Sequence, residues 1–386
     1  MSERKLKQWL DAGLIDATTH QKISDYETEH ARPLGLWAII GLGALAIGLG
    51  VISVVAANWD DIPAYVRLGI HSLLIVGLAV WIYLQPPRPD TFGLYLKDVA
   101  LFVWAVLGLT FFGHLGQVYQ TSSPLWQPLL AWLLLFGPIV LLIGRGWLVS
   151  LMIMAGLVGT GLEYLNWYTR QMDSPSALVI ALVTSIPVFA MVAAIFMRNL
   201  NQERDAFWKQ IAQISLLLFT AGVTFKLIVE GFGTSSFFSS GDSDGHIAAV
   251  HAAIWGIGAG AVIWFSRARR EQGIAGILVI GGLASFMSSL LPSSSSLLAG
   301  IIFITFWAAI GGISIYAGWR KVFQAAVAIV ALRLIILSFE LATDLLASGV
   351  GLIMAGVITI GVAVAAYRFS RAFAPTSNAE QSGDEG

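Results

Sequence analysis

Apolar runs of about 20 residues recur along the sequence from residue 35 onward, and short polar segments separate them. An α-helix rises 1.5 Å per residue, so about 20 residues cross the roughly 30 Å hydrocarbon core of a bilayer. Only 12% of the residues are charged, about half the fraction found in an ordinary soluble domain. The pattern therefore predicts an all-α, polytopic transmembrane helix bundle. It excludes an outer-membrane barrel, because barrel strands alternate polar and apolar residues over about 10 positions.

The runs predict twelve spans, and the basic residues predict their orientation. The spans lie near residues 35–57, 68–85, 97–116, 125–143, 147–166, 177–197, 208–229, 246–265, 273–291, 297–318, 322–343 and 348–367. Loops rich in Lys and Arg stay in the cytoplasm. With a cytoplasmic N-terminus, eighteen of the 22 basic residues fall inside, Arg67 and Arg170 fall outside, and Lys226 and Arg333 lie within spans. Both termini are therefore expected in the cytoplasm.

The composition suggests three parts. Residues 1–33 are expected to form a cytoplasmic helical hairpin, residues 34–372 the transmembrane helical domain, and residues 373–386 a disordered cytoplasmic tail, because the tail is polar and poor in hydrophobic residues. Trp residues such as Trp126 and Trp167 stand at predicted span ends, as expected of an interfacial belt.

The hairpin is predicted from apolar spacing and from helix end signals. Its first helix carries apolar residues at helical intervals, namely Leu6, Trp9, Leu10 and Leu14. Gly13 is expected to end that helix. The second helix is expected to begin at Asp16 or Thr18, where "TTHQ" fits a Ser/Thr-x-x-Gln capping box. The hairpin could dock a protein partner, or it could pack on the membrane domain.

Several classes of chemistry are excluded. The chain has no Cys, so disulfides, thiolate catalysis and Cys-ligated metals are ruled out, and a net charge of −1 gives no sign of nucleic-acid binding. The charged N-terminus lacks the apolar core of a cleavable signal. "GLGALAIGLG" (41–50) lies inside a span, so it is not a nucleotide-binding turn. His246 and His251 are five apart, which does not fit a zinc helix. No cofactor, metal site or catalytic residue is predicted.

Three separated motifs resemble those of a known family. They are "LKQWLDAGLIDATTHQKISDYE" (6–27), "LGALAIGLGVISVVAANWDDIP" (42–63) and "GQVYQTSSPLW" (116–126). In this order they resemble the bacterial predicted membrane proteins of domain of unknown function (DUF) 2157, and "RLIILSFELATDLLASGVGLIMAG" (333–356) looks like the C-terminal part of that family. The resemblance implies a multi-pass protein of the bacterial inner membrane, with no established activity.

Polar residues within the spans gather in the outer half of the membrane in the predicted orientation. The set, called the outer polar set below, consists of Asn58, Asp60, His71, His114, Gln117, Tyr119, Gln120, Glu163, Asn166, Lys226, Glu230, His251, Arg333, Glu340 and Asp344. One interpretation is that helix ends near water tolerate polar groups. The other is an outward-facing vestibule or ligand pocket, because ionisable groups inside a bilayer usually face a cavity or one another. Asp98 is the exception on the inner side.

Arg333 is the deepest member of the set. It lies eleven residues into its span, which is roughly 16 Å at 1.5 Å per residue. Burying Arg there costs about 2.5–3.5 kcal/mol on the insertion scale, so a partner on another helix is expected, and Glu163 is the best-placed acid. Arg333 could then clamp two helices, or it could bind a substrate anion or gate a pathway. Lys226 and Glu230 are i,i+4 neighbours that can pair with each other.

Three functions fit these features. The favoured one is a structural or regulatory membrane protein that docks a partner through its hairpin, with the bilayer around it and no nucleic acid. The alternative is a transporter or channel-like protein for a small polar solute. An envelope enzyme acting through the outer carboxylates and histidines has the least support.

Overall fold

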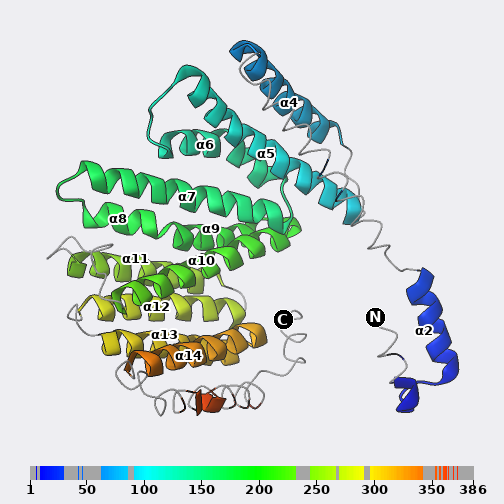
Figure 1. Ribbon diagram of the computed structural model, residues 1–386, viewed down its shortest axis with the longest axis vertical. Helices are drawn as coiled ribbons and strands as arrows, with labels where there is room; N and C mark the ends of the chain where they lie inside the picture. Colours follow the sequence, from blue (N-terminus) through cyan, green and yellow to red (C-terminus); the bar gives the residue numbers. More distant parts are fainter. Residues whose placement is uncertain are drawn as a thin grey trace. The chain divides into compact units, whose positions relative to one another are not determined.

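The computed structural model describes residues 9–29, 62–85, 91–231, 244–266, 269–290 and 296–341, together with a few isolated positions. Within these ranges the chain forms helices and no strand, which confirms the predicted all-α class (Figure 1). It divides into two compact units, Met1–Gly69 and Ile70–Gly386.

In the first unit, Gly13 ends the first helix as the sequence predicts. Gly13 has φ +68°, a left-handed conformation that costs glycine little because it has no Cβ. The Gly13 N–H donates to the Leu10 carbonyl at 3.0 Å, and the Leu14 N–H donates to the Trp9 carbonyl at 2.9 Å. These two bonds together form a Schellman motif, which satisfies carbonyls that the helix end would leave without partners. That this region is a cytoplasmic hairpin stays a prediction.

The next helix, α2 (Ala17–Glu29), begins directly after Asp16. The Thr19 N–H donates to Asp16 Oδ1 at 3.1 Å, so Asp16 is the N-cap. The predicted capping box starting at Thr18 is wrong, because Thr18 already lies inside the helix. Hydrogen bonds from the Thr19 hydroxyl and amide lower the pKa of Asp16 below its ordinary value.

The helices that follow are long and apolar. α4 (Ala64–Leu84) crosses the boundary between the units. The second unit continues with α5 (Thr91–Tyr119), α6 (Trp126–Ile143), α7 (Trp147–Gln171), α8 (Ala177–Thr184), α9 (Ile186–Leu200), the short 3-10 helix η1 (Gln202–Arg204), α10 (Asp205–Gly231), α11 (Asp244–Phe265), α12 (Arg269–Ser289), α13 (Ser296–Tyr316) and α14 (Arg320–Leu341).

The helices of the second unit lie side by side in a stack, in which neighbours in space are not always neighbours in sequence (Figure 1). α7 packs on α5, α6, α8, α9 and α10; α10 also packs on α12 and α13; α11 packs on α8, α9 and α12; and α13 packs on α14. Small residues allow this close approach. A Cβ added to Gly258 of α11 would lie 2.6 Å from the Val188 side chain of α9, so a larger residue there would push the two helices apart.

Eight described helices are long and apolar enough to cross a membrane: α4 to α7 and α10 to α13. The bent pair α8 and α9 would make a ninth. This confirms a multi-pass membrane protein. The predicted spans 35–57 and 348–367 lie outside the described residues, and α14, which covers the predicted span 322–343, is not among the eight. The count of twelve therefore stays a prediction.

One predicted span, 177–197, is broken. α8 and α9 meet at Ser185 with a bend of 49°. Pro187, two residues into α9, has no N–H to donate, and its ring clashes with the carbonyl four residues earlier in a continuous helix. Ser185 at the break has φ −87° and ψ 6°, so the α-helical ladder stops there and restarts.

Reporter fusions test the predicted orientation. Fusions after residues 90, 203, 269 and 320 are expected in the cytoplasm, and fusions after residues 122, 172, 240 and 294 are expected outside, because basic loops are retained inside. A dual reporter active on opposite sides of the membrane gives the measurement. An external signal at 203 or 269 would contradict the twelve-span arrangement, since each of those loops carries three basic residues.

The Asp16 N-cap is expected to make the stability of the α2 N-terminus depend on pH. The pKa of Asp16 is lowered in the folded chain, so its contribution to the helix is fully present above the ordinary Asp pKa of about 3.9 and is lost as the pH falls through the lowered pKa. Amide hydrogen exchange at Thr19 should speed up in Asp16→Ala and stay slow in Asp16→Asn, which keeps a cap oxygen. Asp11→Ala is the control, and equal exchange in all three variants would exclude Asp16 as the cap.

Candidate functional site

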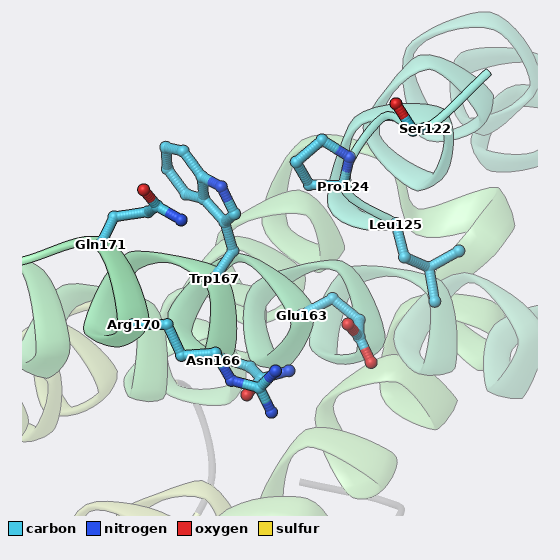
Figure 2. A pocket seen from close by; sticks show the side chains of 8 residues that line it. All are labelled: Ser122, Pro124, Leu125, Glu163, Asn166, Trp167, Arg170 and Gln171. Atoms are coloured by element: carbon cyan, nitrogen blue, oxygen red, sulfur yellow. The ribbon is translucent and has the colours of Figure 1, made fainter.

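A pocket of about 290 Å³ lies between the α5–α6 loop and the C-terminal end of α7 (Figure 2). Its lining comes from the loop residues Ser122, Pro124 and Leu125 and from the α7 residues Glu163, Asn166, Trp167, Arg170 and Gln171. Glu163 and Asn166 belong to the outer polar set, so the structure gives these two members of the set a shared hollow. This is the feature of the described chain that comes nearest to the outward-facing pocket expected from the sequence.

The polar side chains of the pocket are not used by the rest of the described chain. Asn166, Arg170 and Gln171 are exposed and Glu163 is half-buried. Among the described residues, none of these four side chains takes part in an ion pair or a side-chain hydrogen bond. A carboxylate, a guanidinium and two amides are therefore open to water or to a ligand.

An aromatic cluster stands beside the pocket. The Trp126 ring at the start of α6 lies 5.4 Å from the Tyr164 ring and 5.5 Å from the Trp167 ring. Tyr164 also stacks on Tyr168, with ring centroids 5.9 Å apart. Trp and Tyr concentrate at membrane–water interfaces, so this end of α6 and α7 has the composition of an interfacial belt.

His71 of α4 and His114 of α5 form a second site. Their Nδ1 atoms lie 3.3 Å apart, and His71 Nε2 lies 2.9 Å from the Leu107 carbonyl. A carbonyl only accepts, so His71 carries a proton on Nε2, and one proton lies between the two Nδ1 atoms. His114 is buried. The pair therefore joins α4 to α5, which is one way in which polar groups inside a membrane bundle find partners.

The other predicted residues at the end of α5 do not join either site. Gln117 and Tyr119 are exposed. Gln120 has φ +49°, and the Thr121 N–H donates to the Gly116 carbonyl at 3.1 Å, so Gln120 occupies the left-handed position that ends α5. This position explains part of the polar run after residue 113 by helix termination.

A buried polar cluster surrounds the break between α8 and α9. The Thr184 hydroxyl lies 2.5 Å from His251 Nε2, and the Trp255 indole donates to the Ser185 hydroxyl at 2.8 Å. Thr184 already donates to the Ile180 carbonyl at 2.7 Å, so it accepts from the Nε2–H of His251. Within the described residues, His251 Nδ1 is buried without a hydrogen-bond partner.

Lys226 of α10 lies in the same part of the bundle. Its ammonium donates to the Ser285 carbonyl and to the Ser288 hydroxyl of α12, both at 3.1 Å. Lys226 therefore joins α10 to α12. The structure does not describe the Glu230 side chain, so the predicted pairing of Lys226 with Glu230 stays a prediction. The side chains of four other predicted site residues are not described either: Asn58, Asp60, Glu340 and Asp344.

Arg333 is buried against α13. Its guanidinium carbon lies 5.9 Å from the Phe303 ring centroid, a distance at which a cation is attracted by the ring face. Glu163 forms no ion pair among the described residues and lines the pocket instead. The expected clamp between Arg333 and Glu163 is therefore wrong, because matching depth in the sequence did not bring α7 and α14 together.

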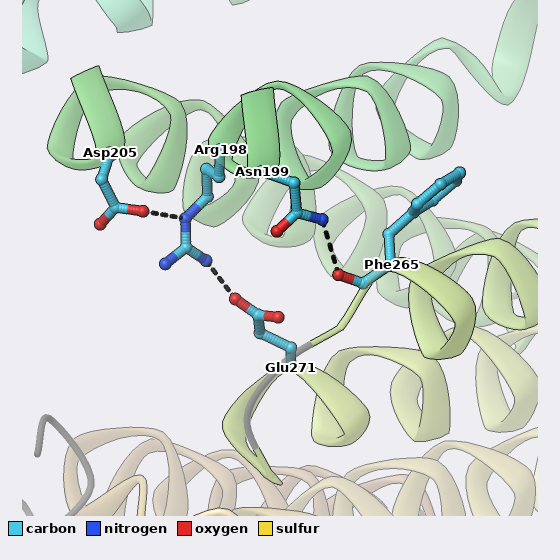
Figure 3. A network of polar contacts seen from close by, with 5 residues as sticks. All are labelled: Arg198, Asn199, Asp205, Phe265 and Glu271. Carbon is cyan, nitrogen blue, oxygen red and sulfur yellow. Dashed lines mark hydrogen bonds and ion pairs between the residues drawn. The ribbon is translucent and has the colours of Figure 1, made fainter. Parts of the chain in front are cut away.

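At the end of the bundle that carries most of the basic residues, an ionic network joins four helices (Figure 3). Arg198 of α9 donates from Nε to Asp205 Oδ1 at 2.7 Å and from Nη1 to Glu271 of α12. Asn199 donates to the Phe265 carbonyl, the last of α11, at 2.8 Å. The sequence pattern did not predict this network, although Asp205 and Glu271 stand beside basic loops, which was a signal for it.

A second contact at that end involves Asp98 and Arg204. The Arg145 N–H donates to Asp98 Oδ1 at 3.0 Å. Arg204 donates to the Leu141 carbonyl at 2.5 Å and to the Gly144 carbonyl, which are acceptors at the C-terminal end of α6. Asp98, the predicted inner exception, therefore holds the α6–α7 loop in place.

The ionic network predicts unequal losses of stability. Glu271 has a side chain 13% exposed and Asp205 one that is 47% exposed, so water replaces the Asp205 contact more easily. Glu271→Gln is expected to lower the free energy of unfolding by about 1–3 kcal/mol, and Asp205→Asn by less than about 1 kcal/mol. Thermal unfolding in detergent gives the measurement. A larger effect of Asp205→Asn would contradict this assignment.

Comparison with known protein families gives a match in the N-terminal part of the chain, where the three quoted motifs lie. Residues 7–149 match the family model described as "Predicted membrane protein (DUF2157)", and this range holds nearly all of the three quoted motifs. No curated protein matches the chain, and no solved structure does. The resemblance seen in the sequence is therefore confirmed. The chain is therefore similar to the DUF2157 predicted membrane proteins over residues 7–149, and that family name assigns no activity.

Proposed function

We propose that this chain is a multi-pass inner-membrane protein with a structural or regulatory role, exerted through a protein partner at the hairpin of residues 1–33. The observation that supports this proposal is that several buried polar side chains form hydrogen bonds to a neighbouring helix. The Trp132 indole donates to the Ala105 carbonyl at 2.7 Å, and the Trp104 indole donates to the Ile75 carbonyl at 3.1 Å. His71, Lys226 and Trp255 likewise bond to neighbouring helices. Side chains that form these bonds hold the helices together, so they are not available to line a solute pathway.

The hairpin supports a docking role by its exposed apolar residues. Trp9 is 38% exposed and Leu14 is 72% exposed, and the Schellman turn at Gly13 holds the two at the same end of a helix. Trp is enriched among the residues that dominate protein–protein interfaces, so an exposed Trp9 suits a protein partner better than an aqueous surface. Both termini, in this proposal, are cytoplasmic.

The alternative is a carrier of a small polar solute, and the break between α8 and α9 favours it. Transporters build their sites from interrupted helices near the middle of the membrane. Here the break at Ser185 is flanked by His251, which is ionisable and buried. In a carrier, His251 and Thr184 would contact the solute, and in the structural proposal they hold α11 against α8.

The structural role of the buried indoles can be tested with Phe. Trp132→Phe and Trp255→Phe remove one interhelical hydrogen bond each and keep an aromatic ring, so each is expected to lower the free energy of unfolding by about 0.5–1.5 kcal/mol. Trp264→Phe on α11 is the control, because Trp264 is 84% exposed. Thermal unfolding of the purified protein is the readout, and equal effects of all three substitutions would count against the buried contacts.

Cross-linking in living cells tests the function itself. A photo-reactive residue at Leu14 is expected to give one adduct of defined mass, and Gly13→Val should abolish it by disfavouring the left-handed turn. The same photo-reactive residue at Asp11 is the positional control. Adducts that are equally diffuse at both positions would contradict a docked partner. Saturable solute uptake by proteoliposomes that is lost in a stably folded His251→Phe variant would replace this proposal with the carrier.

A further inference from the structure

We propose that the pocket between the α5–α6 loop and α7 binds a zwitterionic group, an ammonium joined to a phosphate or carboxylate. The two sources of this chemistry are a phosphoethanolamine lipid headgroup and a free small zwitterion such as an amino acid. This goes beyond the structural or regulatory role, which needs no ligand. It rests on the pocket residues shown in Figure 2.

The α7 side of the pocket is a polar stripe on a helix that is otherwise apolar. From Trp147 to Leu162 the helix has no charged residue, and its polar residues are small. Its last turns then carry Glu163, Asn166, Trp167, Arg170 and Gln171 at spacings of i, i+3, i+4, i+7 and i+8. These spacings place all five on one face. The polar face looks onto the loop that carries Ser122 and Pro124.

The two charges of the stripe are of opposite sign and are separated. Glu163 and Arg170 are seven residues apart, roughly 10 Å along the axis at 1.5 Å per residue. They form no ion pair with each other within the described chain. In Figure 2 the Glu163, Asn166 and Arg170 side chains project from the same side of α7. A ligand that carries both charges can reach each of them at once.

Each charge fits one end of such a ligand. The Glu163 carboxylate accepts hydrogen bonds from an ammonium, and the Arg170 guanidinium offers a planar fork that suits phosphate or carboxylate oxygens. A ligand with a single charge would neutralise one of the two groups and desolvate the other without a partner, which is costly beside a low-polarity environment. A zwitterion neutralises both and so is favoured.

The remaining wall of the pocket is apolar and held in place. The Trp167 ring lies against Trp126 and Tyr164, so its orientation is set by neighbours, and an ammonium close to its face gains a cation–π attraction. At about 290 Å³ the pocket is just below the range typical of sites for drug-sized ligands, about 300–1,000 Å³. That size suits a headgroup or an amino acid.

The aromatic cluster places the pocket where lipid headgroups lie. Trp126, Tyr164 and Tyr168 have the composition of an interfacial belt. Leu125, in the pocket wall, and Leu162, one residue before Glu163, are each 57% exposed. Acyl chains could cover both leucines while the headgroup occupies the polar stripe. A lipid would therefore contact both the polar stripe and the two leucines, whereas a free amino acid would leave the leucines uncovered.

The experiment uses the full-length protein in nanodiscs and measures thermal unfolding. Discs of phosphatidylethanolamine are expected to raise the unfolding midpoint relative to discs of phosphatidylglycerol, whose headgroup has no ammonium. Glu163→Gln and Arg170→Gln should each abolish that difference. Asp173→Asn, an exposed acid just beyond α7, is the matched control and should keep it. Equal midpoints of all variants in phosphatidylglycerol show that the substitutions leave the fold intact.

Two further arms separate the sources and can overturn the proposal. Glycine or phosphoethanolamine added to phosphatidylglycerol discs identifies a free zwitterion if it raises the midpoint in wild type and not in Glu163→Gln. Native mass spectrometry should retain one more phosphatidylethanolamine on wild type than on Arg170→Gln if the ligand is the lipid. The proposal is overturned if neither lipid nor soluble zwitterion gives a shift, or if the shift persists in both pocket variants. It fails equally if a purely cationic or anionic probe gives the same protection.

Discussion

Every polar group within the hydrocarbon core of a bilayer must find its partner within the protein, because no water is there to supply one. Many polar side chains of the described helices follow this constraint, although His251 Nδ1 and the Trp208 and Trp307 indole nitrogens are buried without a hydrogen-bond partner there. Buried indoles donate to carbonyls of the neighbouring helix, His71 and His114 share one hydrogen bond, and Lys226 caps acceptors of α12. Arg204 provides partners for backbone acceptors, because it donates to carbonyls at the end of α6. Such contacts fix which helix lies beside which.

The break at Ser185 shows how the same constraint shapes an irregular backbone. Pro187 removes one donor and displaces an acceptor, and non-helical backbone at membrane depth survives only where protein surrounds it. Ser185 is fully buried, and the Trp255 indole donates to its hydroxyl. His251 contacts Thr184 on the other side of the break. α11 therefore stabilises the interruption, which is why α11 cannot be treated as an interchangeable apolar helix.

Much of the architecture could be predicted because it depends on local composition. Runs of apolar residues predict helices, and Gly13 predicts a helix end, since both follow from neighbours in sequence. The break at Ser185 was missed because Pro187 sits inside a run that is apolar throughout. The pairing of Arg333 with Glu163 failed for another reason: depth along the membrane normal says nothing about which helices are adjacent. Arg333 lies against Phe303 on α13, the helix that precedes its own.

The outer polar set shows that residues predicted to lie at a similar depth in the membrane need not form one site. Within the described chain its members divide among different tasks: His114 pairs with His71, Gln120 ends α5, His251 supports the break, and Glu163 faces the pocket. Three of these satisfy groups of the protein itself. Glu163 differs from them: it and Arg170, which also lines the pocket, form no ion pair within the described structure. Since charges near a bilayer interface are costly unless water or a ligand meets them, the pocket is the place in the described chain at which we propose a ligand.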